Sequence, residues 1–82
     1  MTKGEYRVGI NFNPSGDDHV GKIKRQAAHL IDLIESVPLP DVDSLESAMH
    51  SNDVARLKAL AQTEIESAAM WAVKAATKPP ME

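Results

Sequence analysis

A repeating apolar pattern in the first half of the chain most limits what it can fold into. Apolar residues recur every seven positions in two interleaved series, Val20, Ala27 and Ile34, and Ile23, Leu30 and Val37. This is the a/d pattern of a helix that packs along another helix. Ser15 is a good N-cap, and Asp17 and Asp18 follow where the helix dipole favours negative charge. The pattern predicts a helix over residues 15–37.

A proline-containing stretch, "PLPDVD", follows this helix. Pro38 and Pro40 lack the amide hydrogen and restrict the residues before them, so they end the helix. Asp43, with Glu46 three positions later, resembles a capping pair. We predict a linker over residues 38–51 that contains a short helix.

A second long helix is predicted over residues 52–77, with Ser51 or Asn52 as its N-cap. Its apolar stripe follows spacings of three and four, at Val54, Leu57, Ala61, Ile65, Ala68, Ala72 and Ala76. A continuous stripe of this kind packs against one partner helix. The proline-containing connection then predicts an antiparallel hairpin.

The second helix also has apolar residues outside this stripe. At about 100° per residue, Leu60 and Trp71 lie to one side of it and Met70 lies almost opposite. One partner helix cannot cover all of these positions, and a chain of 82 residues buries little core by itself. We predict that Leu60, Met70 and Trp71 form an interface between copies of the chain. The alternative is an Ala-rich helix with a few exposed apolar residues.

The N-terminal residues have a different periodicity. Tyr6, Val8, Ile10 and Phe12 alternate with polar residues and glycine, a period of two that predicts an extended segment. The sequence therefore predicts an all-α fold: an antiparallel helical hairpin with a short extended N-terminal arm, assembling as a homo-oligomeric helical bundle. A single domain is predicted over residues 1–82. It begins with an extended arm (1–14) and a helix (15–37), continues with a linker (38–51) and a second helix (52–77), and ends in a tail (78–82).

The composition argues against several classes of protein. A formal net charge of −3 does not suit a dedicated binder of duplex nucleic acid. The chain has no cysteine, no apolar run long enough to span a membrane and no signal peptide, so a soluble intracellular protein is expected. The histidines are scattered, and no phosphate-binding glycine loop or nucleophile elbow is present. We expect a binding protein without metal, cofactor or catalytic residues.

Basic residues should gather at the open end of the predicted hairpin. Seven of the nine are expected there, Lys3, Arg7, Lys22, Lys24, Arg25, Lys74 and Lys78. Lys24 falls on the border of the packed seam, where it could meet a phosphate while a base stacks on Tyr6. Arg7, Phe12 and Lys22 are further candidate ligand contacts. The alternatives are a solvated charged face and aromatic residues that only pack the arm, with Phe12 as a hydrophobic staple.

Three stretches of the sequence resemble a known family. They are "YRVGINFNPSG", "KIKRQAAHLIDLIE" and "ARLKALAQTEIESAAMWAVKAATKP", which together make up most of the chain. The pattern is similar to the small phage-encoded anti-CBASS protein two and its relatives, which share a helical hairpin domain with Thoeris anti-defence protein one. The resemblance implies a homo-oligomer, commonly a hexamer, that sequesters cyclic nucleotide second messengers without turnover in the cytoplasm of the infected host.

The resemblance also implies particular ligand contacts. An arm tyrosine that stacks on a base corresponds to Tyr6, a phosphate-binding lysine to Lys24, and a nearby polar residue to Gln26. The family's basic contact from the last helix falls at Gln62, beside Thr63, and Gln62 is not basic. The implied ligands are cyclic di- or trinucleotides, with cyclic ADP-ribose isomers as a further class.

Two other functions compete with this one. An interaction module would dock a host protein on the apolar face around Met70 and Trp71, while the arm adds a strand to the partner's sheet. A small enzyme that degrades the messenger is the third class, and the absence of catalytic groups argues against it.

Overall fold

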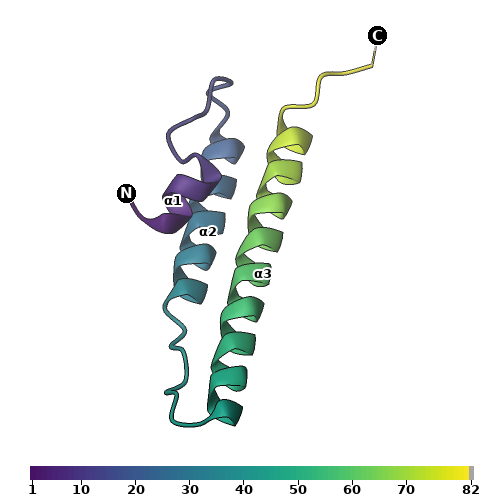
Figure 1. Ribbon diagram of the computed structural model, residues 1–82. Coiled ribbons are helices and arrows are strands. Elements are labelled where there is room, and N and C mark those ends of the chain that lie inside the picture. Colours follow the sequence, from purple (N-terminus) through teal and green to yellow (C-terminus); the bar gives the residue numbers. More distant parts are fainter. Residues whose placement is uncertain (82) are drawn as a thin grey trace.

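The computed structural model describes residues 1–81 and contains three helices within them. Helix α1 spans Lys3–Val8, α2 spans Asp18–Glu35 and α3 spans Leu45–Ala76. Helices α2 and α3 run antiparallel side by side, and α1 lies against α2 (Figure 1). The molecule is elongated, with extents of 60 × 27 × 13 Å. The predicted all-α antiparallel hairpin is confirmed.

The prediction of an extended N-terminal arm is wrong, because Lys3–Val8 is helical. A capping box starts this helix: the Thr2 hydroxyl accepts a hydrogen bond from the Glu5 amide at 3.1 Å, and the Glu5 carboxylate accepts one from the Thr2 amide at 2.8 Å. Gly9 ends it in the left-handed conformation, at φ 64°. Caps at both ends outweigh a period-two pattern that covers only a few residues.

Helix α1 docks on α2 through a glycine. A Cβ atom on Gly4 would overlap the carbonyl oxygen of Ala28 and lie 2.8 Å from its carbonyl carbon. The backbones of the two helices therefore approach more closely than any side chain would allow. The Asp32 carboxylate accepts a hydrogen bond from the Gly4 amide at 2.7 Å, which satisfies a free donor in the first turn of α1.

Helix α2 is shorter than predicted, since its N-cap is Asp17 rather than Ser15 and it ends at Glu35 rather than Val37. Its buried residues are Val20, Lys24, Ala28 and Ile31. The heptad pattern predicted a different buried face, and Leu30, for example, is 43% exposed. The face is rotated because α1 covers part of α2 that a simple two-helix hairpin would leave open.

Helix α3 is uninterrupted from Leu45 to Ala76, so the predicted short helix and the predicted new start at residue 51 or 52 are wrong. Its capping box is formed by Ser44 and Ser47 rather than by Asp43 and Glu46. Ser51 is buried within the helix instead of capping it. Serine and asparagine favour caps but do not by themselves break a helix.

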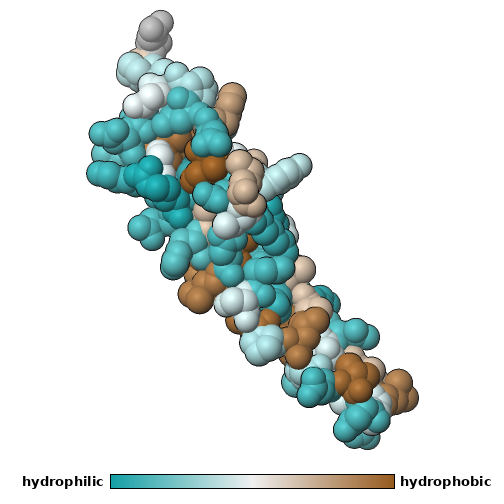
Figure 2. Space-filling model, turned by 90° about the vertical axis from the view of Figure 1, so that its left-hand side faces the viewer, coloured by the Kyte–Doolittle hydropathy of each residue, from teal (hydrophilic) through white to brown (hydrophobic). Residues whose placement is uncertain are grey.

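The face of α3 that packs against the rest of the molecule differs from the predicted stripe. Its buried residues are Ser51, Gln62 and Ala69, whereas Leu57 of the predicted stripe is 51% exposed. Much apolar surface is therefore uncovered, and hydrophobic side chains gather toward the end of the molecule opposite the C-terminus (Figure 2). Within residues 1–81, no helix is both long enough and apolar enough to cross a membrane.

Candidate binding site

A cavity of about 190 Å³ lies where the end of α1 meets α2 and the second half of α3. Its lining is mainly apolar and includes three charged side chains; the lining residues are Arg7, Val8, Lys24, Glu66, Ala69, Met70 and Val73. The structure thus brings two of the predicted ligand-binding residues, Arg7 and Lys24, to one cavity. A few charged groups in an apolar hollow are typical of small-molecule sites.

Lys24 holds the turn that follows α1. It is only 7% exposed, and its ammonium donates hydrogen bonds to the carbonyl oxygens of Gly9, at 3.0 Å, and Phe12. An ammonium has three donors, so these two bonds leave one for the cavity. The sequence predicts Lys24 at the border of a packed seam, as a phosphate contact. In the structure it is buried and supports the fold as well as lining the cavity.

Phe12 lies on the other side of Lys24. The ammonium is 5.5 Å from the centre of the Phe12 ring, within the range of a cation–π interaction. Phe12 and Lys24 also line a second hollow of about 210 Å³, with Val20 and Val73. Phe12 is 71% exposed, and it is not at the position of a hydrophobic staple because the N-cap of α2 is Asp17. An aromatic ring and the Lys24 ammonium therefore adjoin in this second hollow, next to the cavity that Lys24 also lines.

Arg7 reaches from α1 to α3. Its Nε donates to Glu66 Oε1 at 2.6 Å, and its Nη2 donates to the Thr63 hydroxyl at 3.3 Å. The Arg7 and Glu66 side chains are 23% and 34% exposed, so solvent reaches this ion pair only in part. Glu66 is not among the ligand contacts that the sequence predicts, although it lines the cavity. Position 66 lies three residues from Thr63 and from Ala69, a spacing that could have placed it on this face.

Gln62 is not free to bind a ligand in this structure. It is 1% exposed; its amide nitrogen donates to the Ile31 carbonyl at 3.1 Å, and its oxygen accepts from the Lys3 ammonium at 3.1 Å. Glu35 completes the cluster, at 3.0 Å from Lys3. The hydrogen bonds from Lys3 and then from Gln62 lower the pKa of Glu35. Gln62 therefore joins all three helices, and the expectation that it replaces a basic ligand contact is corrected.

The predicted cluster of basic residues is only partly formed. Lys3 lies at the far end of α1 from the cavity, because α1 runs back along α2 and brings it to Glu35. Lys22 and Gln26 are exposed, and neither lines the cavity. Arg25 lines a separate hollow with His29 and other residues. The ion pair of Lys3 with Glu35, at the C-terminal end of α2, accounts for the difference.

Tyr6 is 70% exposed and is not among the residues that line the cavity. Its neighbours in sequence face inward, because Arg7 lines the cavity and Glu5 caps α1. The Tyr6 ring is therefore available to a ligand or to another copy of the chain.

Asp32 anchors the other side of α1. Hydrogen bonds from the Thr2 side chain and the Gly4 amide lower its pKa, and His29 adds a smaller electrostatic effect in the same direction. This carboxylate serves the docking of α1 and has no place in the cavity. Across residues 1–81, no group of three or more His, Asp or Glu side chains is arranged to hold a metal ion.

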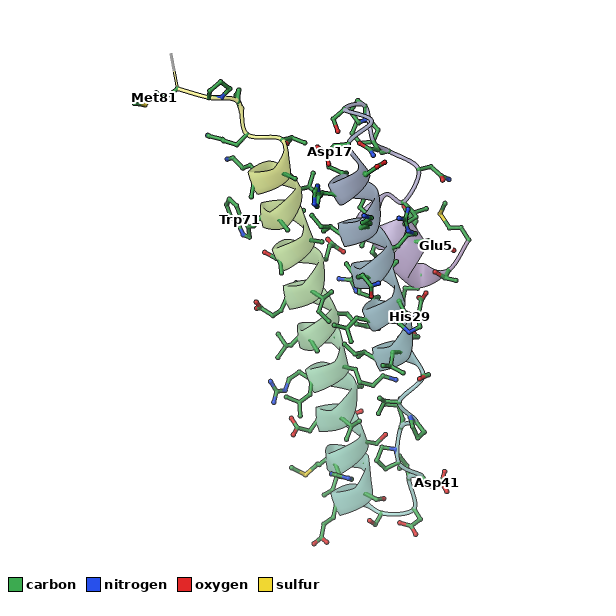
Figure 3. All side chains as sticks on the ribbon, turned by 180° about the vertical axis from the view of Figure 1, so that it is seen from behind. Glu5, Asp17, His29, Asp41, Trp71 and Met81 are labelled. Atoms are coloured by element: carbon green, nitrogen blue, oxygen red, sulfur yellow. The ribbon has the colours of Figure 1, made fainter. Side chains whose placement is uncertain are left out.

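The residues predicted to form an interface are available for one. Leu60 is 48% exposed, Met70 66% and Trp71 67%. Figure 3 shows Trp71 on the side of α3 that is turned away from α2, with the Lys74 ammonium 5.6 Å from its ring. Of these three residues, Met70 also lines the cavity.

Comparison with known proteins identifies the family of this chain. The family described as "Acb2/Tad1, hairpin domain" matches residues 4–77. Neither the curated proteins nor the solved structures contain a significant match. The chain therefore belongs to the Acb2/Tad1 hairpin family, as its sequence resemblance predicted, and this membership suggests an anti-defence role in which small signalling molecules are bound.

Proposed function

We propose that this member of the Acb2/Tad1 hairpin family is a phage-encoded sponge. It binds cyclic di- or trinucleotide second messengers, releases them unchanged and so blocks CBASS-type signalling in the host cytoplasm. The observation that carries the proposal is the meeting of Arg7 and Lys24 in one mainly apolar cavity. Cations recognise phosphate groups, and the apolar walls suit the flat faces of bases.

The dimensions of the cavity support a site that is completed by a second copy. Its volume of about 190 Å³ is below the roughly 300–1,000 Å³ of pockets that enclose small ligands. Met70 lines the cavity and is also 66% exposed, so a neighbouring copy that covers this residue would deepen the hollow. We therefore propose a homo-oligomer, with a hexamer as the expected assembly of this family.

The absence of turnover is part of the proposal. The charged groups of the cavity are Arg7, Lys24 and Glu66, and Glu66 already accepts a hydrogen bond from Arg7. A carboxylate that already accepts a hydrogen bond from a guanidinium is not free to accept a proton from a bound ligand. A sponge requires affinity and no such base.

Calorimetry with a panel of cyclic dinucleotides, cyclic trinucleotides and cyclic ADP-ribose isomers tests the proposal. At least one should bind at micromolar concentration or tighter and be recovered intact after the complex is heated. A mass measurement on the same sample should give a homo-oligomer. A folded monomer that binds no member of the panel would contradict the proposal.

The alternative is a protein-interaction module, which the exposure of Met70 and Trp71 favours. The expected addition of the N-terminal arm to a partner's sheet is not part of this alternative, because residues 3–8 are helical and offer no strand. Capture of a defined host protein by the wild-type chain, lost in Trp71→Ser while cyclic-nucleotide binding is retained, would support this function.

A further inference from the structure

The polar surface of the cavity contains a group that opposes anion binding. Arg7 and Lys24 are positive, but Glu66 is negative and lies 2.6 Å from Arg7. At this distance the carboxylate neutralises much of the guanidinium's field, and an incoming phosphate must compete with it. Lys24 compensates only in part, because the carbonyls of Gly9 and Phe12 occupy two of its three donors and leave one for a ligand.

We propose that Glu66 is an internal competitor for the ligand's phosphate and that it sets both the affinity of the site and its preference for ligands with more than one phosphate. This rests on the proposed function, because it assigns a role to Glu66 in the same cavity. In the free chain the carboxylate holds Arg7 across the gap between α1 and α3. When a phosphate arrives, the guanidinium exchanges the carboxylate for the phosphate.

The preference for several phosphates follows from charge. With Glu66 in place the three charged groups of the cavity sum to one positive charge. A ligand with a single phosphate gains contact with one cation and meets the Glu66 carboxylate beside it. A cyclic dinucleotide can reach Arg7 and Lys24 together, so its gain exceeds the repulsion.

Glu66→Gln separates the charge from the hydrogen bond. The glutamine oxygen can still accept from Arg7 Nε, so the position of Arg7 is retained while the negative charge is removed. Glu64→Gln is the matched control, because Glu64 lies on the same helix, carries the same charge and is exposed outside the cavity.

The test is calorimetric titration of wild type, Glu66→Gln and Glu64→Gln with cyclic di-AMP, cyclic di-GMP and cyclic AMP at two salt concentrations. Glu66→Gln should bind the dinucleotide that wild type prefers about threefold to tenfold more tightly, and Glu64→Gln should stay within about twofold of wild type. The affinity of Glu66→Gln should also fall more steeply with salt concentration than that of wild type. Its increase in affinity for cyclic AMP over wild type should be at least as large as its increase for the dinucleotide. Adding Arg7→Gln to Glu66→Gln should abolish the gain.

Weaker binding by Glu66→Gln, or binding equal to that of Glu64→Gln, would overturn the role of Glu66 while leaving the sponge intact. If none of the three proteins binds any nucleotide, the proposed function fails and pyrophosphate becomes the probe. A larger pyrophosphate-dependent rise in melting temperature for Glu66→Gln than for Glu64→Gln would then support Glu66 as a competitor. Equal rises would refute it.

Discussion

The molecule has two junctions between consecutive helices. In both, a lysine of the second helix donates hydrogen bonds to backbone carbonyls of the junction, but the surroundings of the two lysines differ. In the α1–α2 junction the carbonyls of Gly9 and Phe12 accept hydrogen bonds from Lys24 of the next helix. In the α2–α3 junction the carbonyls of Glu35 and Val37 accept them from Lys58, again of the next helix. In each case an ammonium donates to carbonyl groups at the end of a helix or in the turn that follows it.

The surroundings of the two lysines differ. Lys24 is buried and lines a cavity with Arg7 and Glu66, and the Phe12 ring lies beside it. Lys58 borders a hollow at the surface, and the linker beyond it exposes apolar side chains such as Val42, at 60%. Residues of all three helices line both hollows, with Lys3 of α1 at the second, so the difference is one of burial: Lys24 is 7% exposed, whereas Lys58 is only half-buried. The other junction offers an apolar surface for packing.

The largest effect is expected from a substitution that displaces α1 from α2. Gly4→Ala should lower the free energy of unfolding by about 2–3 kcal/mol, because the new Cβ would overlap the Ala28 carbonyl and force α1 away from α2. Chemical denaturation measures the loss, and hydrogen exchange in residues 3–8 should rise. Gly21→Ala is the control: its Cβ meets only the mobile Arg25 guanidinium, at 3.1 Å, so it should stabilise α2 by up to about 1 kcal/mol. Equal effects of the two changes would contradict the close approach.

The second test compares exposed apolar side chains at the two junctions. Tyr6 on α1 is 70% exposed and Leu45 beside the linker is 78% exposed, so neither Tyr6→Ala nor Leu45→Ala should change the stability of a single chain appreciably. Tyr6→Ala should weaken cyclic-nucleotide binding by about 1–3 kcal/mol through loss of base stacking, and Leu45→Ala should leave it unchanged. Calorimetry decides, and unaltered binding by Tyr6→Ala would remove this residue from the site.

The third test compares the two lysine caps directly. Lys24→Met should lower the free energy of unfolding by about 1–2 kcal/mol, since it removes a buried charged donor from two carbonyls. Lys58→Met should cost less than about 1 kcal/mol, because its carbonyls are exposed and water can replace the ammonium. Urea denaturation of the two variants shows which one loses more free energy of unfolding. A larger loss for Lys58→Met would show that the burial of Lys24 does not matter to the fold.

The smallest effect is expected from acid. The pKa values of Asp32 and Glu35 are lowered by hydrogen bonds that hold α1. A lowered folded-state pKa adds stability above the unfolded-state pKa, and this stability is lost as pH falls through the folded-state value. The free energy of unfolding should therefore decline below about pH 4. Asp32→Asn should flatten this decline when denaturation is followed from pH 6 to about pH 2. An unchanged profile would show that Asp32 does not anchor α1.

Only a small part of the cavity lining was predicted from the sequence. Arg7 and Lys24 were predicted as ligand contacts and do share a cavity. Gln62 was assigned to the ligand because a family pattern placed a contact there, and only the structure shows that its amide is used between helices. Glu66 escaped notice because a single glutamate on a helix says nothing of the arginine that will pair with it from another.

The sequence by itself determined that two long helices would form and fold back, since apolar periodicity and the prolines at 38 and 40 are local signals. Only the tertiary structure decided the rest: that residues 3–8 are helical, that Gly4 seats them on α2, and that the buried faces of α2 and α3 are rotated from their apolar stripes. The reason is that a third helix competes for the same surface. The face that each long helix buries depends on the packing of all three helices. The apolar periodicity of one helix carries no information about the other two.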